Sequence, residues 1–569
     1  MKNTLVKTLL ATLACALYIP LQAATITVSS NLDSGSGCTL RKAIAKINTA
    51  GVAVNDCSSI GSFGNEDTIN LLLPTNSKIS LLSSGIDLTE SMEITTQSEG
   101  ITIEPKSGEV VFTIGQENQI VDVTLRNLTF TNASREDMNG GAIVINQPLT
   151  TVKVENSSFT SNYARLGSGI YLTAGRLSVR DSVFNDNAAQ YWGAGVYCDA
   201  PFTPMASCEI RRSTFENNLG LVGLQATDIG TDPDGGAAIY LSEIQNVTIV
   251  DSQFNANRLL DTAIEDGAGG AVAINNAKNV SIFSNSFVGN KAGFGGAVFL
   301  KQLIGEISVA GNMFELNEAG VFGGALMTWN IGKADQAAKL VSNSFVQNKA
   351  PNGAALLAYT DHIENTNNTW FANRASADGG AVKLISPRRH VMKHNTFVEN
   401  HADTDGGAVM TESGGNVEIV NNLFIKNRAG NLGADIRSSG TNFADLDNNI
   451  LGDTEITTTQ SVVGLTLPAT TVYGTNDAAT PHTINEVLLP PVRNELQFIF
   501  VPLIGSPVVN AASVSHCPTL DQRGRVRVTT ACDVGAIELK ESDIAAQQIY
   551  DTQFIVIPTS DHNVVVVPL

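Results

Sequence analysis

The hydrophobic and polar positions of this chain alternate over short runs separated by turn-forming residues. In the run NVSIFSNSF, from Asn279 to Phe287, every second side chain faces the same way if the segment is a β-strand. Strict alternation would place Phe283, Asn285 and Phe287 on one face. Gly, Asn and Ser recur between such runs, and these residues favour turns. The pattern predicts many short strands joined by tight turns.

A repeated motif organises these strands. Nine copies of F-x-x-N are present, Trp370 begins a tenth copy and Phe130 a degraded eleventh. Successive copies are mostly 25 to 33 residues apart, with one step of 39. One unit of this size cannot bury its apolar face alone, whereas stacked units can. The nine copies begin at Phe159, Phe184, Phe215, Phe254, Phe287, Phe314, Phe345, Phe397 and Phe424.

Each unit is therefore expected to form one coil of an all-β, single-stranded, right-handed parallel β-helix. Stacking at about 4.8 Å would place equivalent residues over one another. The Asn that ends F-x-x-N falls where the strand should bend. Glycine pairs such as Gly269-Gly270 and Gly406-Gly407 follow most copies. They give either a second bend or a place where a side chain would collide with the next coil.

Polar residues two positions before the aromatic residue keep the same register from unit to unit. Serines occupy this place in the early units: Ser157, Ser182, Ser213 and Ser252. Asparagines occupy it in six consecutive later units: Asn285, Asn312, Asn343, Asn368, Asn395 and Asn422. Stacked Asn side chains stabilise cross-β packing. We expect an internal amide ladder beside a column that includes Phe287, Phe314, Phe345, Phe397 and Phe424.

The alternation of F-x-x-N with GGA and an aliphatic residue, over about residues 126–440, resembles the repeats of polymorphic outer membrane proteins of the chlamydial type. The resemblance implies a β-helix displayed at the cell surface and, as in several members, a role in adhesion.

The N-terminal segments indicate export and capping. Residues 1–23 resemble a secretory signal peptide, and residues 24–66 are expected to cap the stack. Within Cys38–Asn48 (CTLRKAIAKIN), apolar residues at helical spacing predict a short helix that covers the open strand ends. This stretch resembles the module named for its CSLREA sequence, which implies export. Residues 67–450 are the predicted coils.

Residues 451–540 are expected to hold the terminal coils and a C-terminal β cap. GSPVVNAA and CPTLDQRGRVRVTTACDVGAIE, at 505–512 and 517–538, resemble the choice-of-anchor module of exported repeat proteins. The arginines and acids of the second stretch predict a structural ion-pair cluster. Residues 541–569 are expected to form a hairpin, and no run of about 20 apolar residues predicts a transmembrane segment in the mature chain.

Composition narrows the partners and the compartment. The chain has 569 residues, 16% of them charged, and a formal charge of −20, which becomes −22 if Lys2 and Lys7 leave with a signal peptide. Nucleic acid is disfavoured as a partner, because phosphates require a basic stripe and the sequence has none. Six cysteines follow the signal, in three near pairs, and an oxidising compartment favours disulfides over zinc. The predicted bonds are Cys38–Cys57, Cys198–Cys208 and Cys517–Cys532.

Two groups of residues are candidate sites. Asp378 and Asp405 each precede a glycine pair in adjacent units. Stacking would bring them within about 5 Å, close enough to share Ca²⁺, whereas turn chemistry is the simpler interpretation. Insertions between the Asn bend and the glycine pair, at 219–234 and 259–266, predict a binding face. Its candidate residues are Asp232, Asp234, Glu265 and Asp266.

We therefore expect an exported, non-catalytic, monomeric β-helix protein, extracellular or on the outer surface of a Gram-negative-type bacterium. Its expected role is adhesion or another surface interaction with a glycan or protein ligand, with no catalytic residues and no cofactor other than the calcium considered above. The alternative is a secreted polysaccharide lyase or glycoside hydrolase of the pectin-degrading β-helix type.

Overall fold

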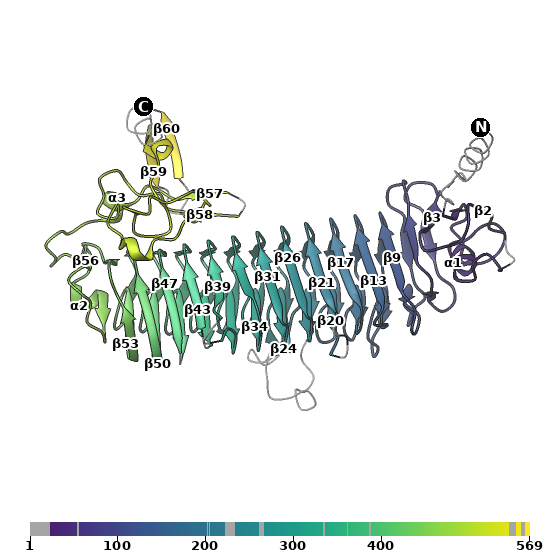
Figure 1. The fold of residues 1–569 in the computed structure, drawn as a ribbon, viewed down its shortest axis with the longest axis horizontal. Helices are drawn as coiled ribbons and strands as arrows, with labels where there is room; N and C mark the ends of the chain where they lie inside the picture. The colour runs from purple at the N-terminus through teal and green to yellow at the C-terminus, as the bar shows by residue number, and fades with distance from the viewer. Residues whose placement is uncertain are drawn as a thin grey trace, which may run out of the picture.

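One repeat unit folds into one coil of short strands. The unit at Asn279 runs through β31 (Asn279–Phe283), β32 (Ser286–Val288), β33 (Lys291–Phe294) and β34 (Val298–Lys301). Each strand pairs in parallel with its equivalent in the next coil, so Phe287 lies opposite Phe314 of β36 (Met313–Glu315). The backbone groups of each coil thereby bond to the coils on either side. Repetition of this unit builds the long stack in Figure 1.

Three long sheets run along the stack. This computed structural model describes residues 23–53, 56–201, 203, 205–221, 234–260, 267–333, 336–360, 362–385, 388–494 and 496–544, and the backbones of 554–558 and 564–568. A 15-stranded sheet extends from β4 (Lys78–Ser80) to β56 (Val472–Tyr473), and a 13-stranded sheet from β11 (Ser134–Arg135) to β52 (Arg428–Ala429). The third sheet has 28 strands in two rows that join at β50 (Val409–Val420). The predicted all-β parallel β-helix is confirmed.

The aromatic residues of the repeats stack in a single internal column. From Phe130 to Phe424, including Trp370, neighbouring ring centroids lie 4.1 to 5.7 Å apart and the rings are within 20° of parallel. These side chains are fully buried. The spacing follows the separation of neighbouring strands, about 4.8 Å, so strand pairing sets the ring geometry.

Two asparagine ladders flank this column. In the first, the side-chain amides from Asn285 to Asn449 donate to the next Oδ1 at 2.9 to 3.2 Å. In the second, the Asn that ends each F-x-x-N donates in the same way from Asn162 to Asn427, at 2.9 to 3.0 Å. The second ladder corrects the sequence interpretation. The left-handed backbone of the bend belongs to the preceding residue, such as Leu316 (φ 56°), and not to Asn317.

The strand pattern also departs from strict alternation at Ser284. Asn285 and Phe287 are buried, but Phe283 is 48% exposed and points outward. Ser284 adopts φ 54°, a left-handed conformation that turns the chain between β31 and β32. Phe283 therefore belongs to the outer face of β31, contrary to the prediction from period-two spacing.

The glycine pairs serve both purposes suggested by the sequence. Gly406 has φ 68°, which forms the bend. A Cβ on Gly407 would lie 2.3 Å from the carbonyl oxygen of Ala434 in the next coil, so close stacking excludes a side chain there.

The N-terminal end of the stack is covered by α1 (Leu40–Asn48), which lies there in Figure 1. Its buried face consists of Leu40, Ala43, Ile44 and Ile47, the residues at helical spacing. Thr39 caps the helix by accepting a hydrogen bond from the backbone N–H of Lys42 at 3.4 Å. Cys38 and Cys57 are disulfide-bonded beside it.

The C-terminal module, residues 488–544, lies against the side of the last coils and not over their end (Figure 1). The end carries α2 (Thr458–Ser461) and β56, while α3 (Ile484–Val487) leads into the module. The module packs on outward apolar residues of the 15-stranded sheet, among them Val346, Phe371 and Val398. This placement corrects the expectation of a cap that closes the last coil. Beyond it, the backbones of β59 (Phe554–Pro558) and β60 (Val564–Pro568) pair as an antiparallel hairpin. Among the described helices, none has the length and apolar character needed to cross a membrane.

Candidate functional site

A groove runs across the outer face of six neighbouring strands. Because side chains alternate along a strand, every second residue of these strands points away from the core. The hollow above them has a volume of about 850 Å³. The strands are β26 (Asn246–Val250), β31, β35 (Ile307–Ala310), β39 (Ala338–Val341), β43 (His362–Thr366) and β47 (Arg389–Lys393).

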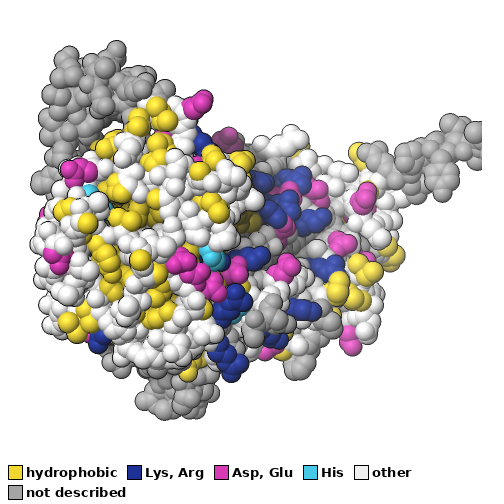
Figure 2. Space-filling model, turned by 60° about the vertical axis from the view of Figure 1, so that its left-hand side comes forward, with side chains coloured by type: hydrophobic (Ala, Val, Ile, Leu, Met, Phe, Trp, Pro, Cys, Tyr) yellow, Lys and Arg dark blue, Asp and Glu magenta, His cyan; other side chains and the backbone are white. Residues whose placement is uncertain are grey.

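A second hollow of about 1070 Å³ continues the first and shares Lys339 and Glu364 with it. One wall consists of module residues 518–524, and exposed Phe283 lies on the other side. Figure 2, which brings the C-terminal side forward, shows a hollow beside the module with basic and acidic side chains gathered around it. We call the two hollows together the long groove.

The wall is held in place by hydrogen bonds between the module and the corners of the coils. Asn367 donates to the carbonyl oxygen of Leu520 at 2.7 Å, and Thr369 donates to Gln522 at 2.6 Å. Arg527, whose side chain is 0% exposed, donates to Asn367 at 2.9 Å and lies 3.3 Å from Glu538. Buried charges are stable only when they are paired and hydrogen-bonded. The predicted ion-pair cluster lies within the module, and the hydrogen bonds of Asn367 and Thr369 hold the module beside the groove.

Charged side chains bound the groove on its N-terminal side. Glu209, one coil before Thr248, accepts hydrogen bonds from Arg180 and Ser178, each at 2.8 Å, and contacts Arg211. Burial alone would raise the pKa of Glu209, but these hydrogen bonds lower it to about 2. The Glu209 carboxylate is thus paired with Arg180 and Arg211. The equivalent positions in the next coils, which line the groove, hold uncharged residues.

The two aspartates predicted to share calcium are engaged by protein groups. Asp378 accepts from Thr404 and from the backbone N–H of Asp405 at 3.3 Å, and its other oxygen lies 3.1 Å from Lys383. Burial would raise the pKa of Asp378, but these contacts lower it. Asp405 lies 3.5 Å from Arg437. The two residues are stacked as expected, and the calcium assignment stays a prediction.

The structure does not describe the side chains of the predicted loop face. Asp232, Glu265 and Asp266 lie outside the described residues, and Asp234 is described by its backbone only, in β24 (Asp234–Gly235). The long groove is on another sheet, and sequence reasoning missed it. A signal was present, because NVTIV and NVSIF place small polar residues at alternate, outward positions.

The cysteines match two of the three predicted pairs. Cys517 and Cys532 are disulfide-bonded, as are Cys38 and Cys57. Cys198 and Cys208 are buried thiols whose sulfurs lie 3.5 Å apart without a bond. His394 approaches Cys517 and Cys532 to within 4.8 Å, but the bond between those sulfurs leaves no thiolate for a metal.

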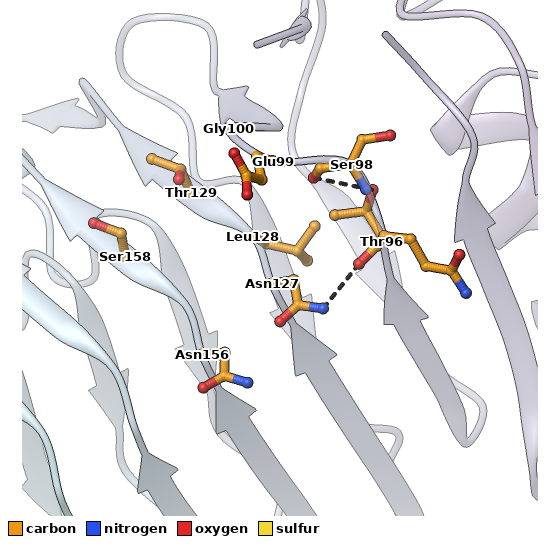
Figure 3. Close-up of a pocket in the computed structure, with 10 residues that line it drawn as sticks. Thr96, Ser98, Glu99, Gly100, Asn127, Leu128, Thr129, Asn156 and Ser158 are labelled. Atoms are coloured by element: carbon orange, nitrogen blue, oxygen red, sulfur yellow. Dashed lines mark hydrogen bonds between the residues drawn. The ribbon is translucent and has the colours of Figure 1, made fainter. Parts of the chain in front are cut away.

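A smaller hollow of about 340 Å³ lies near the N-terminal end (Figure 3). Asn127 donates to the carbonyl oxygen of Thr96 at 2.8 Å, and the Ser98 N–H donates to the Thr96 hydroxyl at 3.0 Å. These two contacts lie within the lining, and Glu99 is the one charged lining residue among those described. We assign it no function.

The comparisons with known proteins do not assign the chain to a family. No family model matches the chain, and no curated protein matches it. Among solved structures, it is similar to pectate lyase Pel9A, with 10% sequence identity and a TM-score of 0.21, over 91% of this chain and 96% of that chain. A likeness at this level carries no argument about activity. The fold assignment rests on the strand register described above.

Proposed function

We propose that this protein is an exported, non-catalytic binding protein that acts in adhesion or another surface interaction through the long groove. The observation that supports this most directly is the preformed cleft, which lies over paired strands and is walled by a module hydrogen-bonded to the corners of the coils. Ligand sites are typically concave and largely preformed. The signal-like residues 1–23 and the bonds Cys38–Cys57 and Cys517–Cys532 support export.

The carboxylates of the groove favour binding over hydrolysis. Glu306 and Glu364 line it on strands two coils apart and in different outward columns. Two coil steps separate the backbones of these residues by about 10 Å, which is above the roughly 5 to 9.5 Å that separates paired carboxyl groups in glycosidases. This backbone spacing supports the non-catalytic interpretation over a secreted glycoside hydrolase, and the polysaccharide assay below tests the lyase.

Two assays on the purified mature chain test the proposal. Labelled protein is expected to bind intact bacterial or eukaryotic cells saturably. The same preparation, incubated with uronic-acid polymers and neutral polysaccharides with and without Ca²⁺, is expected to release neither unsaturated products nor new reducing ends. Release of such products would show that the protein is a polysaccharide lyase or glycoside hydrolase and would overturn the non-catalytic binding function. The proposal would also be overturned if none of the tested cell types bound the protein saturably.

A further inference from the structure

His362 is a buried polar side chain that faces the groove without a partner. It is 5% exposed and lines the first hollow. Among the described residues, neither Nδ1 nor Nε2 has a hydrogen-bond partner. A neutral imidazole carries one donor and one acceptor, and leaving such groups unsatisfied costs about 1–3 kcal/mol each. Both ring nitrogens are themselves buried, so a ligand group that donates and accepts would satisfy them once the imidazole turns toward the hollow.

The part of the floor over β26, β31 and β35, N-terminal to His362, is rich in hydroxyl and amide groups, whereas Arg389 and Glu364 are the outward neighbours of His362 itself. Thr248, Ser281 and Ser308 occupy one outward column of three consecutive coils. Asn279 lies in the next column, donates to Asn246 at 3.0 Å and accepts the Glu306 N–H at 3.3 Å. Such a floor offers donors and acceptors without a net charge, which suits a hydroxyl-rich ligand better than an ionic one.

The charges around this floor are balanced in sign. Lys339 and Arg389 line the first hollow together with Glu306 and Glu364. Two cations opposite two anions give no single-sign field to attract a polyanion or a polycation. An uncharged ligand is therefore favoured.

Phe283 adds an apolar surface where the floor continues into the second hollow. Its ring is 48% exposed, although phenylalanines are usually buried. An exposed aromatic ring at a binding groove can pack against the apolar face of a ligand. The site thus combines one aromatic surface with many hydroxyl and amide groups.

The shape of the site favours a linear glycan over a peptide strand. The floor is the face of a parallel sheet whose backbone N–H and C=O groups already bond to neighbouring coils. Peptide recognition by strand addition needs a free sheet edge, and this face has none in the described coils. Six strands at about 4.8 Å spacing give a groove about 24 Å long, which fits an extended chain.

We propose that the long groove binds a linear, uncharged oligosaccharide laid across the coils, with a sugar hydroxyl at His362 and a sugar face on Phe283. This assignment rests on the proposed binding function and names its ligand class.

The test is calorimetric titration of the mature chain with neutral hexasaccharides of glucose, mannose, xylose and galactose, and with hexagalacturonate. At least one neutral hexasaccharide is expected to bind. Ser281→Arg, which fills the floor, is expected to weaken that binding at least tenfold, and so is Phe283→Ala. Thr124→Arg is the matched control, because Thr124 lies outward in the same row of strands but outside the groove. His362→Gln is expected to weaken binding less than His362→Ala, since glutamine restores a donor and an acceptor.

Three results would overturn the glycan assignment. They are no binding of any neutral hexasaccharide, equal binding by Ser281→Arg and Thr124→Arg, and tighter binding of hexagalacturonate than of every neutral chain. If cell binding is nevertheless lost in Ser281→Arg, the binding function stands and its ligand is not a neutral glycan. If cell binding is absent altogether, the binding function itself fails.

Discussion

Asn427 donates from its side-chain amide to Oδ1 of Asp435 at 3.0 Å, and this contact ends the second asparagine ladder. The other carboxylate oxygen accepts from the Ser461 hydroxyl at 2.7 Å. Asp435 is fully buried. An amide ladder needs an acceptor after its last donor, because an unsatisfied buried N–H is costly. Asp435 is therefore the terminal acceptor of this ladder, and it places an ionisable carboxyl group in the core.

The first prediction concerns the pH dependence of stability. Burial raises the pKa of Asp435 from 3.8 to about 6. Between pH 4 and pH 6 the folded chain thus holds a proton that the unfolded chain releases, so the contribution of this group to stability falls as pH rises through that window. Asp435→Asn would keep the shape and continue the amide ladder. At pH 7 it is expected to be more stable than the wild type by up to about 3 kcal/mol.

Thermal unfolding of both proteins at pH 4 and pH 7 checks this expectation. The advantage of Asp435→Asn is expected at pH 7 and should shrink or vanish at pH 4. If Asp435→Asn were more stable than the wild type by the same amount at pH 4 and pH 7, or less stable at pH 7, the raised pKa of Asp435 would be contradicted.

The second prediction concerns a rung inside a ladder. The Asn317 side chain accepts from the backbone N–H and side-chain amide of Asn290, and donates to Asn348 and to the carbonyl oxygen of Phe287, all at 3.0 Å. Asn317→Ala leaves these buried groups unpaired and is expected to cost about 3–5 kcal/mol. The control is Asn255→Ala on the outer face, with an expected change within about 0.5 kcal/mol. Denaturant unfolding followed by circular dichroism compares the two. Similar midpoints would show that the ladder is not a stabilising element.

The third prediction concerns the second glycine of a pair. A Cβ on Gly380 would lie 1.9 Å from the carbonyl oxygen of Gly407 in the next coil. Gly380→Ala is expected to cost more than about 3 kcal/mol, because the coils would have to separate. Nothing lies within 4 Å of a Cβ on Gly64, so Gly64→Ala should leave the melting temperature nearly unchanged. A tolerated Gly380→Ala would mean that the stacking of this coil is looser than described.

The fourth prediction concerns the wall of the groove. Arg527 is 0% exposed and Arg525 is 46% exposed. Arg527→Ala leaves Glu538 as an unpaired buried charge, at a cost of about 3–5 kcal/mol. Limited proteolysis is expected to cut this variant within residues 488–544 while the β-helix survives. Arg525→Ala should be as resistant to proteolysis as the wild type. Equal resistance of the two variants to proteolysis would show that Arg527 does not stabilise the module.

The sequence predicts the stack well because its information is local and repeated. Each F-x-x-N carries its own turn and its own buried side chains, so Phe287 and Asn285 are placed correctly. Ser284 shows the limit of this reasoning. Its left-handed backbone is set by the turn between two strands, and period-two spacing contains no information about it. Phe283 was therefore assigned to the wrong face.

The position of the module was harder to infer, although one signal was present. The residue after the column aromatic is polar in early coils, as in Thr160 and Asn185, and apolar in late ones, as in Val346 and Val398. The change marks where the outer face becomes covered. Which segment covers it depends on contacts such as Asn367 with Leu520, 153 residues apart. Such pairings have no local pattern, so the sequence indicates the polar floor of the groove through NVTIV and NVSIF but not the wall that the module forms beside it.

The central claim is that the groove over β26 to β47 is the binding surface. The most direct measurement is the amount of labelled Ser281→Arg and Thr124→Arg that binds to the same cells, at equal concentration and with matched melting temperatures. The account predicts at least a tenfold lower signal for Ser281→Arg and wild-type binding for Thr124→Arg. Equal binding by the two variants would contradict it.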